Sequence, residues 1–428
     1  MTLSWFQIVR LGLVQMALGA IVVLTTSTLN RLMVVEFALP AVLPGLLVAL
    51  HYGIQLSRPR WGFTSDTGGN RTAWIIGGMV ALAIGGFAAA YAVTLFAASY
   101  WSGLTLSVVA YALIGLGVGA SGTSLLALLA TATAPHRRAA AATITWLMMI
   151  FGIAMTAGLA GSFLDPYSPA RLLAVVAIVV ITATALTCLA IAGIERRVSI
   201  IRAEPDPTPF IEGLKEVWAE RRARDFTLFV FLSMNAYFMQ ELILEPFAGL
   251  VWGFTPGQST SLSGAQNGGV FVGMLTVGIM ATGLKIGSLR NWILAGCVGS
   301  AASLVAIAWG GLALPAIGLT VLVVALGFFN GMFAVAAIGS MMALAATGRG
   351  QREGTRMGLW GAAQAIAAGF GGLMGAAAVD ILRGPLADAP AFAVVFTIEA
   401  ALFIAAAAMA LHIMENTRSA RAALVPGE

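Results

Sequence analysis

Seven ionisable or polar residues of this sequence lie in or at the ends of long apolar stretches. They are Asn30, Arg31, Glu36, His51, Glu241, Glu245 and Glu399. A charged side chain at the centre of a membrane helix costs at least about 2.5 kcal/mol, so such residues commonly bind ligands or relay protons. These seven are therefore the candidates for ligand binding or for coupling to an ion.

Each candidate also has a structural interpretation. Arg31 is placed to form an ion pair with Glu36 or Glu245, which would fix two helix ends to each other. His51 is more typical of the membrane interface than of a magnesium site. Glu399 is the deepest carboxylate, and a protonated, hydrogen-bonded acid is an alternative to a proton-coupling role. The sequence leaves both kinds of role open.

Several catalytic motifs are absent from the sequence. Lys215 and Lys285 both follow leucine, so there is no glycine-lysine pair of a nucleotide-binding loop, and no HExxH or GxSxG motif occurs. Paired aspartates that could hold a magnesium diphosphate are also missing. We therefore expect no catalytic residues, no metal bound by the protein alone, and a chain that is not an enzyme.

The composition excludes a water-soluble globular enzyme. Of 428 residues, 59% are hydrophobic and 10% are charged, whereas a soluble domain carries roughly 25% charged residues. Membrane helices need about 20 apolar residues each, so the length allows roughly a dozen of them. The net charge of +5 is explained by basic cytoplasmic loops rather than by nucleic-acid binding.

Apolar runs separated by charged, Pro or Gly residues predict an all-α membrane protein with twelve spans. The first six are 11–33, 38–56, 74–97, 102–132, 143–164 and 171–193. The second six are 226–248, 262–284, 291–311, 314–346, 356–379 and 391–413. With both termini cytoplasmic, only Arg31, Arg171 and Arg383 of the 23 basic residues fall toward the outer side, as the positive-inside rule requires.

The spans predict two halves joined by a linker. We expect an N-terminal six-helix half over 1–194, a cytoplasmic linker over 195–225, and a C-terminal six-helix half over 226–428 that ends in a short cytoplasmic tail. Three prolines within 204–209 interrupt regular helix. The apolar positions that follow them predict an amphipathic helix on the membrane surface.

The two halves also carry a weak internal repeat. A shift of about 212 residues pairs Gly115 with Gly327 and Gly119 with Gly331, in corresponding spans. A duplicated six-helix unit implies a pseudo-two-fold axis along the membrane normal, with a central cavity between the halves. This is the architecture of the major facilitator superfamily, so we expect twelve transmembrane helices in two pseudo-symmetric halves.

One loop motif agrees with that superfamily. The segment 62–71 resembles the superfamily loop G-x-x-x-D-R-x-G-R-R, with matches at Gly62, Asp66, Gly69 and Arg71. Thr67 and Asn70 replace basic residues of the pattern. An acidic side chain beside backbone amides and an arginine predicts a cytoplasmic latch between helices, and a solvated turn is the alternative.

Longer strings resemble a narrower family. NRLMVVEFALPA at 30–41, LILEPFAG at 242–249, RWG at 60–62 with SD at 65–66, and GLWGAAQA at 358–365 are similar to signatures of the bacteriochlorophyll delivery family of PucC and LhaA type. The resemblance covers nearly all twelve spans. Where family members commonly have Tyr-Gly-Gly, this chain has Phe247-Ala248-Gly249, and the preceding glutamate is kept.

The resemblance implies a function in pigment handling. We expect the chain to receive or deliver bacteriochlorophyll, bound through its magnesium, during assembly of light-harvesting and reaction-centre complexes. The implied partners are bacteriochlorophyll synthase and light-harvesting polypeptides, in the intracytoplasmic photosynthetic part of a bacterial inner membrane. The alternatives are a proton-coupled secondary transporter of a small amphipathic solute, with Glu399 or Glu36 as its protonation site, and an assembly scaffold with a closed cavity.

Overall fold

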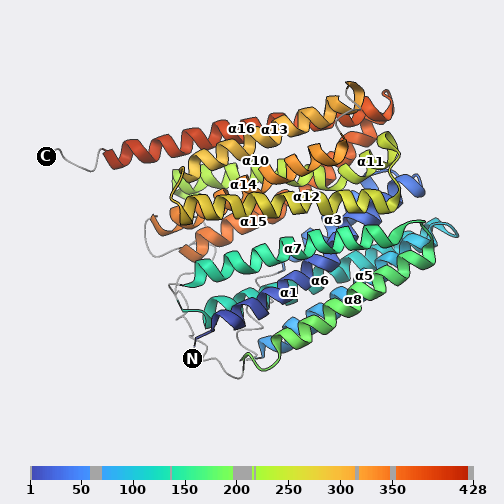
Figure 1. The fold of residues 1–428 in the computed structure, drawn as a ribbon, viewed down its shortest axis with the longest axis horizontal. Helices are drawn as coiled ribbons and strands as arrows, with labels where there is room; N and C mark the ends of the chain where they lie inside the picture. Colours follow the sequence, from blue (N-terminus) through green and yellow to red (C-terminus); the bar gives the residue numbers. More distant parts are fainter. Residues whose placement is uncertain are drawn as a thin grey trace.

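The computed structural model describes residues 2–57, 70–134, 137–195, 215, 218–313, 318–347 and 353–422. Within these ranges the regular structure is helical, and no strand occurs. The helices run side by side along the length of the molecule (Figure 1). The prediction of an all-α protein is confirmed.

The N-terminal half contains six long helical segments. The first is continuous from Trp5 to Glu36 and is divided into α1 (Trp5–Val23), a π-helical segment η1 (Leu24–Thr28), α2 (Leu29–Arg31) and a second π-helical segment η2 (Leu32–Glu36). The others are α3 (Val42–Gln55), α5 (Arg71–Leu95), α6 (Tyr100–Ala132), α7 (Arg138–Leu164) and α8 (Pro169–Ile191).

The C-terminal half also contains six segments. The first is broken into α10 (Arg221–Met239), the 3₁₀ turn η5 (Gln240–Leu242) and α11 (Leu244–Trp252). The second is α12 (Pro256–Val277), which continues as the π-helical η6 (Gly278–Gly283). The remaining four are α13 (Leu289–Ala313), α14 (Leu319–Thr347), α15 (Glu353–Arg383) and α16 (Asp388–Ala422).

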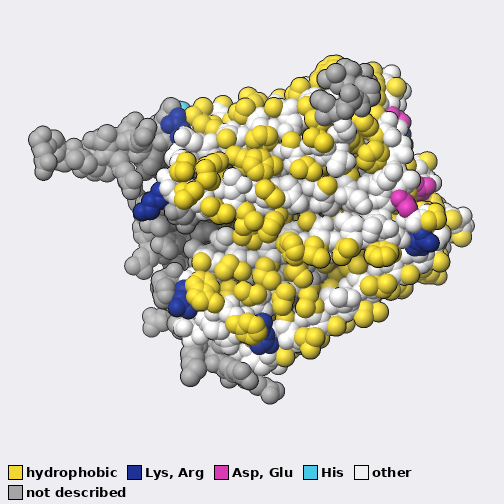
Figure 2. All heavy atoms as spheres, viewed as in Figure 1, with side chains coloured by type: hydrophobic (Ala, Val, Ile, Leu, Met, Phe, Trp, Pro, Cys, Tyr) yellow, Lys and Arg dark blue, Asp and Glu magenta, His cyan; other side chains and the backbone are white. Residues whose placement is uncertain are grey.

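These twelve segments confirm the twelve predicted spans. Ten helices of the described residues are long and apolar enough to cross a membrane, and α3 is a shorter apolar helix of 14 residues. The remaining segment, α12, carries polar residues such as Gln266 and Asn267 along its length. Hydrophobic side chains cover the flank of the bundle, whereas charged side chains lie at its ends (Figure 2). The molecule is therefore a multi-span membrane protein.

Local sequence signals set where several helices begin. Ser4 and Thr255 are the N-caps of α1 and α12, and each exchanges hydrogen bonds with a glutamine three residues later. Pro256 and Pro169 occupy first-turn positions, where a missing N–H costs no hydrogen bond. In contrast, α10 begins at Arg221, inside the predicted linker 195–225, of which most residues lie outside the described part of the chain.

Each half has its own hydrophobic core. One cluster of buried residues comes from α10 to α16 and the other, apart from Leu242, from the N-terminal half. The halves meet where α7 packs against α12 and α3 packs against α15. Gly115 packs against α3 and Gly327 against α12, which places this pair from the internal repeat at equivalent helix crossings. The expected major facilitator fold is confirmed.

Candidate functional site

The end of the bundle opposite the two termini, called the outer end here, carries the largest group of predicted site residues, on the first segment (Figure 1). The helix of this segment widens into the π-helical segments Leu24–Thr28 and Leu32–Glu36, a feature that often accompanies functional sites. The hydroxyls of Thr25 and Thr26 donate to the carbonyl of Val22 at 2.7 and 3.3 Å. Such side-chain bonds to the preceding turn compete with regular helical hydrogen bonds.

Arg31 joins both halves of the protein. Its Nη1 donates to Oε1 of Glu36 at 2.6 Å, and its Nη2 donates to the carbonyl of Phe254, in the C-terminal half, at 2.7 Å. The Arg31 side chain is 3% exposed and that of Glu36 is 36% exposed. Gly249 lies against the guanidinium, because a Cβ there would be 3.2 Å from Nη2. Of the two predicted partners, Arg31 therefore pairs with Glu36.

Asn30 forms a second connection between the halves. Its Nδ2 donates to the carbonyl of Leu242 at 2.7 Å, in the 3₁₀ turn that interrupts the seventh span. Its Oδ1 is buried and has no hydrogen-bond donor among the described residues. Asn30 thus binds the end of η5 through a hydrogen bond between two neutral groups.

Glu245 lies in the first turn of α11 and is 1% exposed. The hydroxyls of Ser27, Ser259 and Ser263 lie close enough to its carboxylate to favour the charged form by hydrogen bonding, and the Arg31 guanidinium acts on it electrostatically. However, neither carboxylate oxygen has a partner with hydrogen-bond geometry within the described part of the chain. The hydroxyls instead bond across the halves, Ser27 to Ser263 at 2.7 Å.

Two further residues face the same cluster. Glu241, in η5, is acted on by the hydroxyl of Thr26, so this predicted residue also faces the first segment. Tyr167 lies in the loop between α7 and α8. Burial raises the pKa of its phenol, Glu36 raises that pKa further, and Arg31 lowers it. The cluster formed by Asn30, Arg31, Glu36, Glu241 and Glu245 is called the outer cluster below.

Two predicted residues lie elsewhere. Glu399 is fully buried on α16, which packs against α13 and α10, and neither carboxylate oxygen has a hydrogen-bond partner among the described residues. His51 lies on α3, and its Nε2 is 2.8 Å from Nε2 of Gln55. The fold therefore brings five of the seven candidates into the outer cluster and leaves these two in separate environments.

The predicted cytoplasmic latch is described only in part. Gly62, Asp66 and Gly69 lie outside the described residues. Arg71 begins α5 and is buried, and its guanidinium donates to the carbonyl of Ala127 and to the hydroxyl of Thr131 on α6. The arginine therefore ties two neighbouring helices of the same half together.

Glu195 is a helix-capping residue of this region that the sequence did not reveal. Its Oε1 accepts from the N–H of Arg71 at 2.9 Å, and its Oε2 accepts from the N–H and hydroxyl of Thr72 at 2.8 and 2.6 Å. A carboxylate here stabilises the positive end of the α5 dipole. In the sequence, Glu195 is only a single glutamate after the sixth span. Nothing there indicates that its hydrogen-bond partner, Arg71, lies 124 residues earlier.

Two aspartates of the outer end were also missed. Oδ1 and Oδ2 of Asp380, on α15, accept from the N–H groups of Ala41 and Val42 at 2.9 and 2.7 Å. Asp165, after α7, accepts from the N–H of Gly257 at 3.1 Å and from the hydroxyl of Thr255 at 2.5 Å. Each carboxylate therefore caps a helix of the opposite half.

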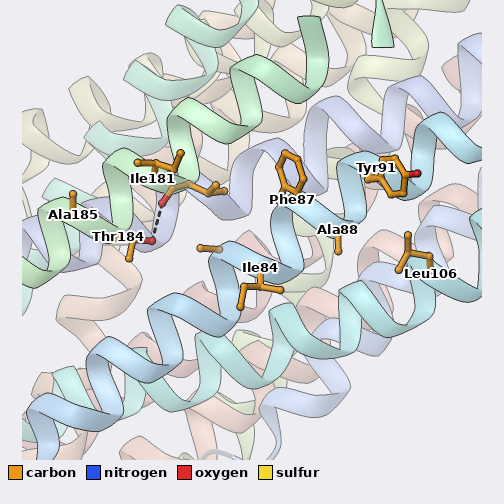
Figure 3. A pocket seen from close by; sticks show the side chains of 10 residues that line it. Ile84, Phe87, Ala88, Tyr91, Leu106, Ile181, Thr184 and Ala185 are labelled. Atoms are coloured by element: carbon orange, nitrogen blue, oxygen red, sulfur yellow. Dashed lines mark hydrogen bonds between the residues drawn. The ribbon is translucent and has the colours of Figure 1, made fainter. Parts of the chain in front are cut away.

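Two grooves lie on the surface of the N-terminal half. One has a volume of about 800 Å³ and lies between α5, α6 and α8. Its lining is almost entirely apolar, with Ile84, Phe87 and Tyr91 contributed by α5 and Ile181 by α8 (Figure 3). The other, about 750 Å³, is lined by α1, α7 and α8 and reaches Asp165 and Arg171 at its outer end. Both volumes suit a bulky apolar ligand.

Known proteins resemble this chain over nearly its whole length. A protein of Rhodobacter capsulatus named bacteriochlorophyll synthase 44.5 kDa chain is 66% identical over 98% of each chain. Protein PucC of Cereibacter sphaeroides is 29% identical over 97% of this chain and 93% of its own. A solved structure described as a bacterial homologue of the human drug peptide transporters PepT1 and PepT2 matches with a TM-score of 0.71 at 14% identity, over 97% and 99% of the two chains.

The first relative corrects one prediction. The absence of short catalytic motifs led to the expectation that the chain is not an enzyme, yet a protein 66% identical to it is named as a chain of a synthase. An active site assembled from side chains on distant membrane helices leaves no short motif. The missing motifs were therefore an inadequate basis for excluding catalysis.

The structural match establishes the fold, and the sequence matches establish the family. The family described as PUCC protein matches residues 28–418, which include the outer cluster and every helix from α2 to most of α16. The chain belongs to the PUCC protein family.

Proposed function

We propose that this protein handles bacteriochlorophyll, or a late precursor of it, as a membrane chain of the bacteriochlorophyll synthase machinery. The observation that carries the proposal is the 66% identity, over 98% of both chains, to a protein named as a bacteriochlorophyll synthase chain. The similarity to proteins named PucC extends the proposal to light-harvesting polypeptides as recipients of the pigment.

The groove between α5, α6 and α8 is the site that best fits such a pigment. A chlorin has a large apolar face, and the exposed rings of Phe87 and Tyr91 offer it aromatic contact area. The Tyr91 hydroxyl can donate to a peripheral carbonyl. The Thr184 hydroxyl donates to the carbonyl of Val180 at 2.7 Å, so its oxygen keeps a lone pair for magnesium or for a water on magnesium.

The outer cluster has a different role in this proposal. Arg31 is nearly buried and already bonded to Glu36 and Phe254, so direct contact with a chlorin would require these bonds to break. We assign the cluster to holding the two halves together at the outer end. The pigment then enters and leaves from the lipid phase, through a groove that opens sideways into the bilayer.

The membrane placement follows from the same proposal. The chain resides in the photosynthetic membrane of a bacterium with both termini cytoplasmic. Helix α1 begins and α16 ends at the same end of the bundle (Figure 1). Most Lys and Arg side chains visible on the drawn face also lie at that end (Figure 2), as the positive-inside rule expects of a cytoplasmic face.

A groove-filling variant tests the proposed site. Ala185 is exposed in this groove, and Ala295 is also exposed on α13, outside it. Purified from pigmented membranes, the Ala185→Phe variant should carry several-fold less bacteriochlorophyll than wild type, while Ala295→Phe should carry the wild-type amount. Equal pigment content in both variants would contradict this placement, and the yield of synthase in the same purification reports separately on the partner.

A second candidate function is proton-coupled transport of a small amphipathic solute. It is supported by the buried carboxylate of Glu399, which has no partner among the described residues, because such groups mark proton pathways in transporters. Reconstituted protein would show gradient-dependent flux that is lost when Glu36 and Glu399 are both replaced by Gln. Unchanged flux in that double variant would remove this candidate.

A further inference from the structure

The seventh span breaks where Glu245 enters the protein interior. Helix α10 ends at Met239, η5 spans Gln240–Leu242, and α11 resumes at Leu244. The first span faces this break with its own irregular segment, the π-helical Leu24–Thr28. Interrupted membrane helices of this kind build ion sites in secondary transporters, because they free polar groups at the depth of the bilayer.

The charge of Glu245 has no dedicated partner within the described part of the chain. The nearby guanidinium of Arg31 gives its hydrogen bonds to Glu36 and to the carbonyl of Phe254, and the Arg31–Glu36 pair is neutral as a unit. Glu245 is left as a 1% exposed carboxylate whose two oxygens accept no hydrogen bond from the described residues. An uncompensated buried carboxylate costs several kcal/mol, so a cation beside Glu245 would be stabilised.

The hydroxyls around Glu245 provide oxygen ligands. Ser259 donates to the carbonyl of Pro256 at 3.2 Å, and Ser27 and Ser263 share one hydrogen bond of 2.7 Å. All three act on the Glu245 carboxylate, but none of these hydroxyls donates to it with hydrogen-bond geometry. Because a hydroxyl carries lone pairs as well as one hydrogen, these oxygens can turn their lone pairs toward a cation beside the carboxylate.

We propose that Glu245, Ser27, Ser259 and Ser263 form a binding site for a sodium ion. Hard oxygen ligands favour an alkali or alkaline-earth cation over a transition metal. A single carboxylate matches one positive charge, whereas calcium sites gather several acidic oxygens. No group of three His, Cys, Asp or Glu residues that could hold a metal occurs among the described residues, which agrees with a monovalent ion.

The ion would connect the two halves. Ser27 belongs to the first span, whereas Glu245, Ser259 and Ser263 belong to the seventh and eighth. Bound sodium would therefore stabilise the arrangement in which the outer ends of the halves meet. This inference does not rest on the pigment proposal, because the site and the groove involve different residues and can be tested on pigment-free protein.

Thermal unfolding of the purified protein tests the site. Apparent Tm is measured in sodium chloride, potassium chloride and choline chloride at equal ionic strength and constant pH. With sodium near 100 times Kd, the expected rise in Tm over choline is about 3 °C. Glu245→Gln should abolish the sodium-specific rise. Glu399→Gln, the same change at another buried carboxylate, should keep it.

A milder variant covers the case in which Glu245→Gln fails to fold. Ser263→Ala removes one ligand at nearly constant volume, and it should raise the sodium concentration for half-maximal stabilisation roughly tenfold. Equal Tm of wild type in all three salts would overturn the proposal and indicate a protonated Glu245. A full sodium response in either site variant would overturn it as well.

Discussion

Asp165 and Asp380 occupy corresponding places in the two halves, and each carboxylate caps the first turn of a helix in the opposite half. Asp380 accepts from the N–H groups of Ala41 and Val42 at the start of α3. Asp165 accepts from Thr255 and Gly257 at the start of α12. The pseudo-symmetry of the fold therefore extends to the hydrogen bonds that close its outer end.

Removing one of these caps should destabilise the protein. Asp380→Ala leaves two N–H groups of α3 without an acceptor, at a cost of about 1–2 kcal/mol. Asp388→Ala is the matched control, because it removes an outer aspartate from a partly exposed ion pair with Arg383 worth at most about 1 kcal/mol. Denaturation in mixed micelles measures both, and an equal loss in the two variants would argue against the capping role.

Gly249 is predicted to be required for the position of Arg31. In Gly249→Ala the new Cβ would lie 3.0 Å from Val35 and 3.2 Å from the guanidinium, and such overpacking costs about 1–3 kcal/mol. Gly53→Ala on α3 is the control, because nothing lies within 4 Å of its added Cβ. That change should be neutral or stabilise the helix by up to about 1 kcal/mol. Unfolding free energies of the two variants measure the difference. A Gly249→Ala variant as stable as Gly53→Ala would contradict the prediction.

The Arg31–Glu36 pair should show strong coupling in a double-mutant cycle. Arg31→Met leaves Glu36 and the carbonyl of Phe254 without their donor, and breaking a buried pair costs about 3–5 kcal/mol. Glu36 is 36% exposed, so Glu36→Gln should cost less. Unfolding free energies of the two single variants and the double variant give the coupling energy, and additive losses would show that the pair contributes nothing.

Tyr167 reports on the same pair through pH. Its phenol has a pKa above the ordinary value, from burial first and from Glu36 second. The folded state therefore favours the neutral phenol, and the stability this contributes is present below about pH 10 and is lost as the pH rises. Glu36→Gln should lower the Tyr167 pKa. This pKa is measured from tyrosinate absorbance, with the Tyr167→Phe variant as the reference. An unchanged pKa in Glu36→Gln would contradict the position of Glu36 beside Tyr167.

The sequence predicted the twelve spans, the two halves and the individual residues that make up the outer cluster, because each of these depends on local composition. The NR…E motif placed Arg31 five residues from Glu36, a spacing that a single helix end brings together. The LEP motif likewise placed Glu245 at the end of the seventh span.

Contacts between distant segments could not be predicted. Asp380 bonds to residues 338 and 339 positions earlier, and only the packing of α3 on α15 brings them together. Glu399 and His51 are polar residues within apolar spans, as the members of the outer cluster are, but they lie on other helices. Apolar periodicity could not separate them from the cluster, because it does not specify which helices become neighbours. The missing motifs misled for the same reason, since a site spread over several spans leaves no local pattern.

The central claim, that this chain handles bacteriochlorophyll, is tested most directly by the absorption spectrum of the protein after gentle solubilisation from pigmented membranes. The account predicts bound bacteriochlorophyll, or a late precursor, in near-stoichiometric amount, together with co-purified synthase. A colourless protein without these partners, from membranes that contain abundant pigment, would contradict it.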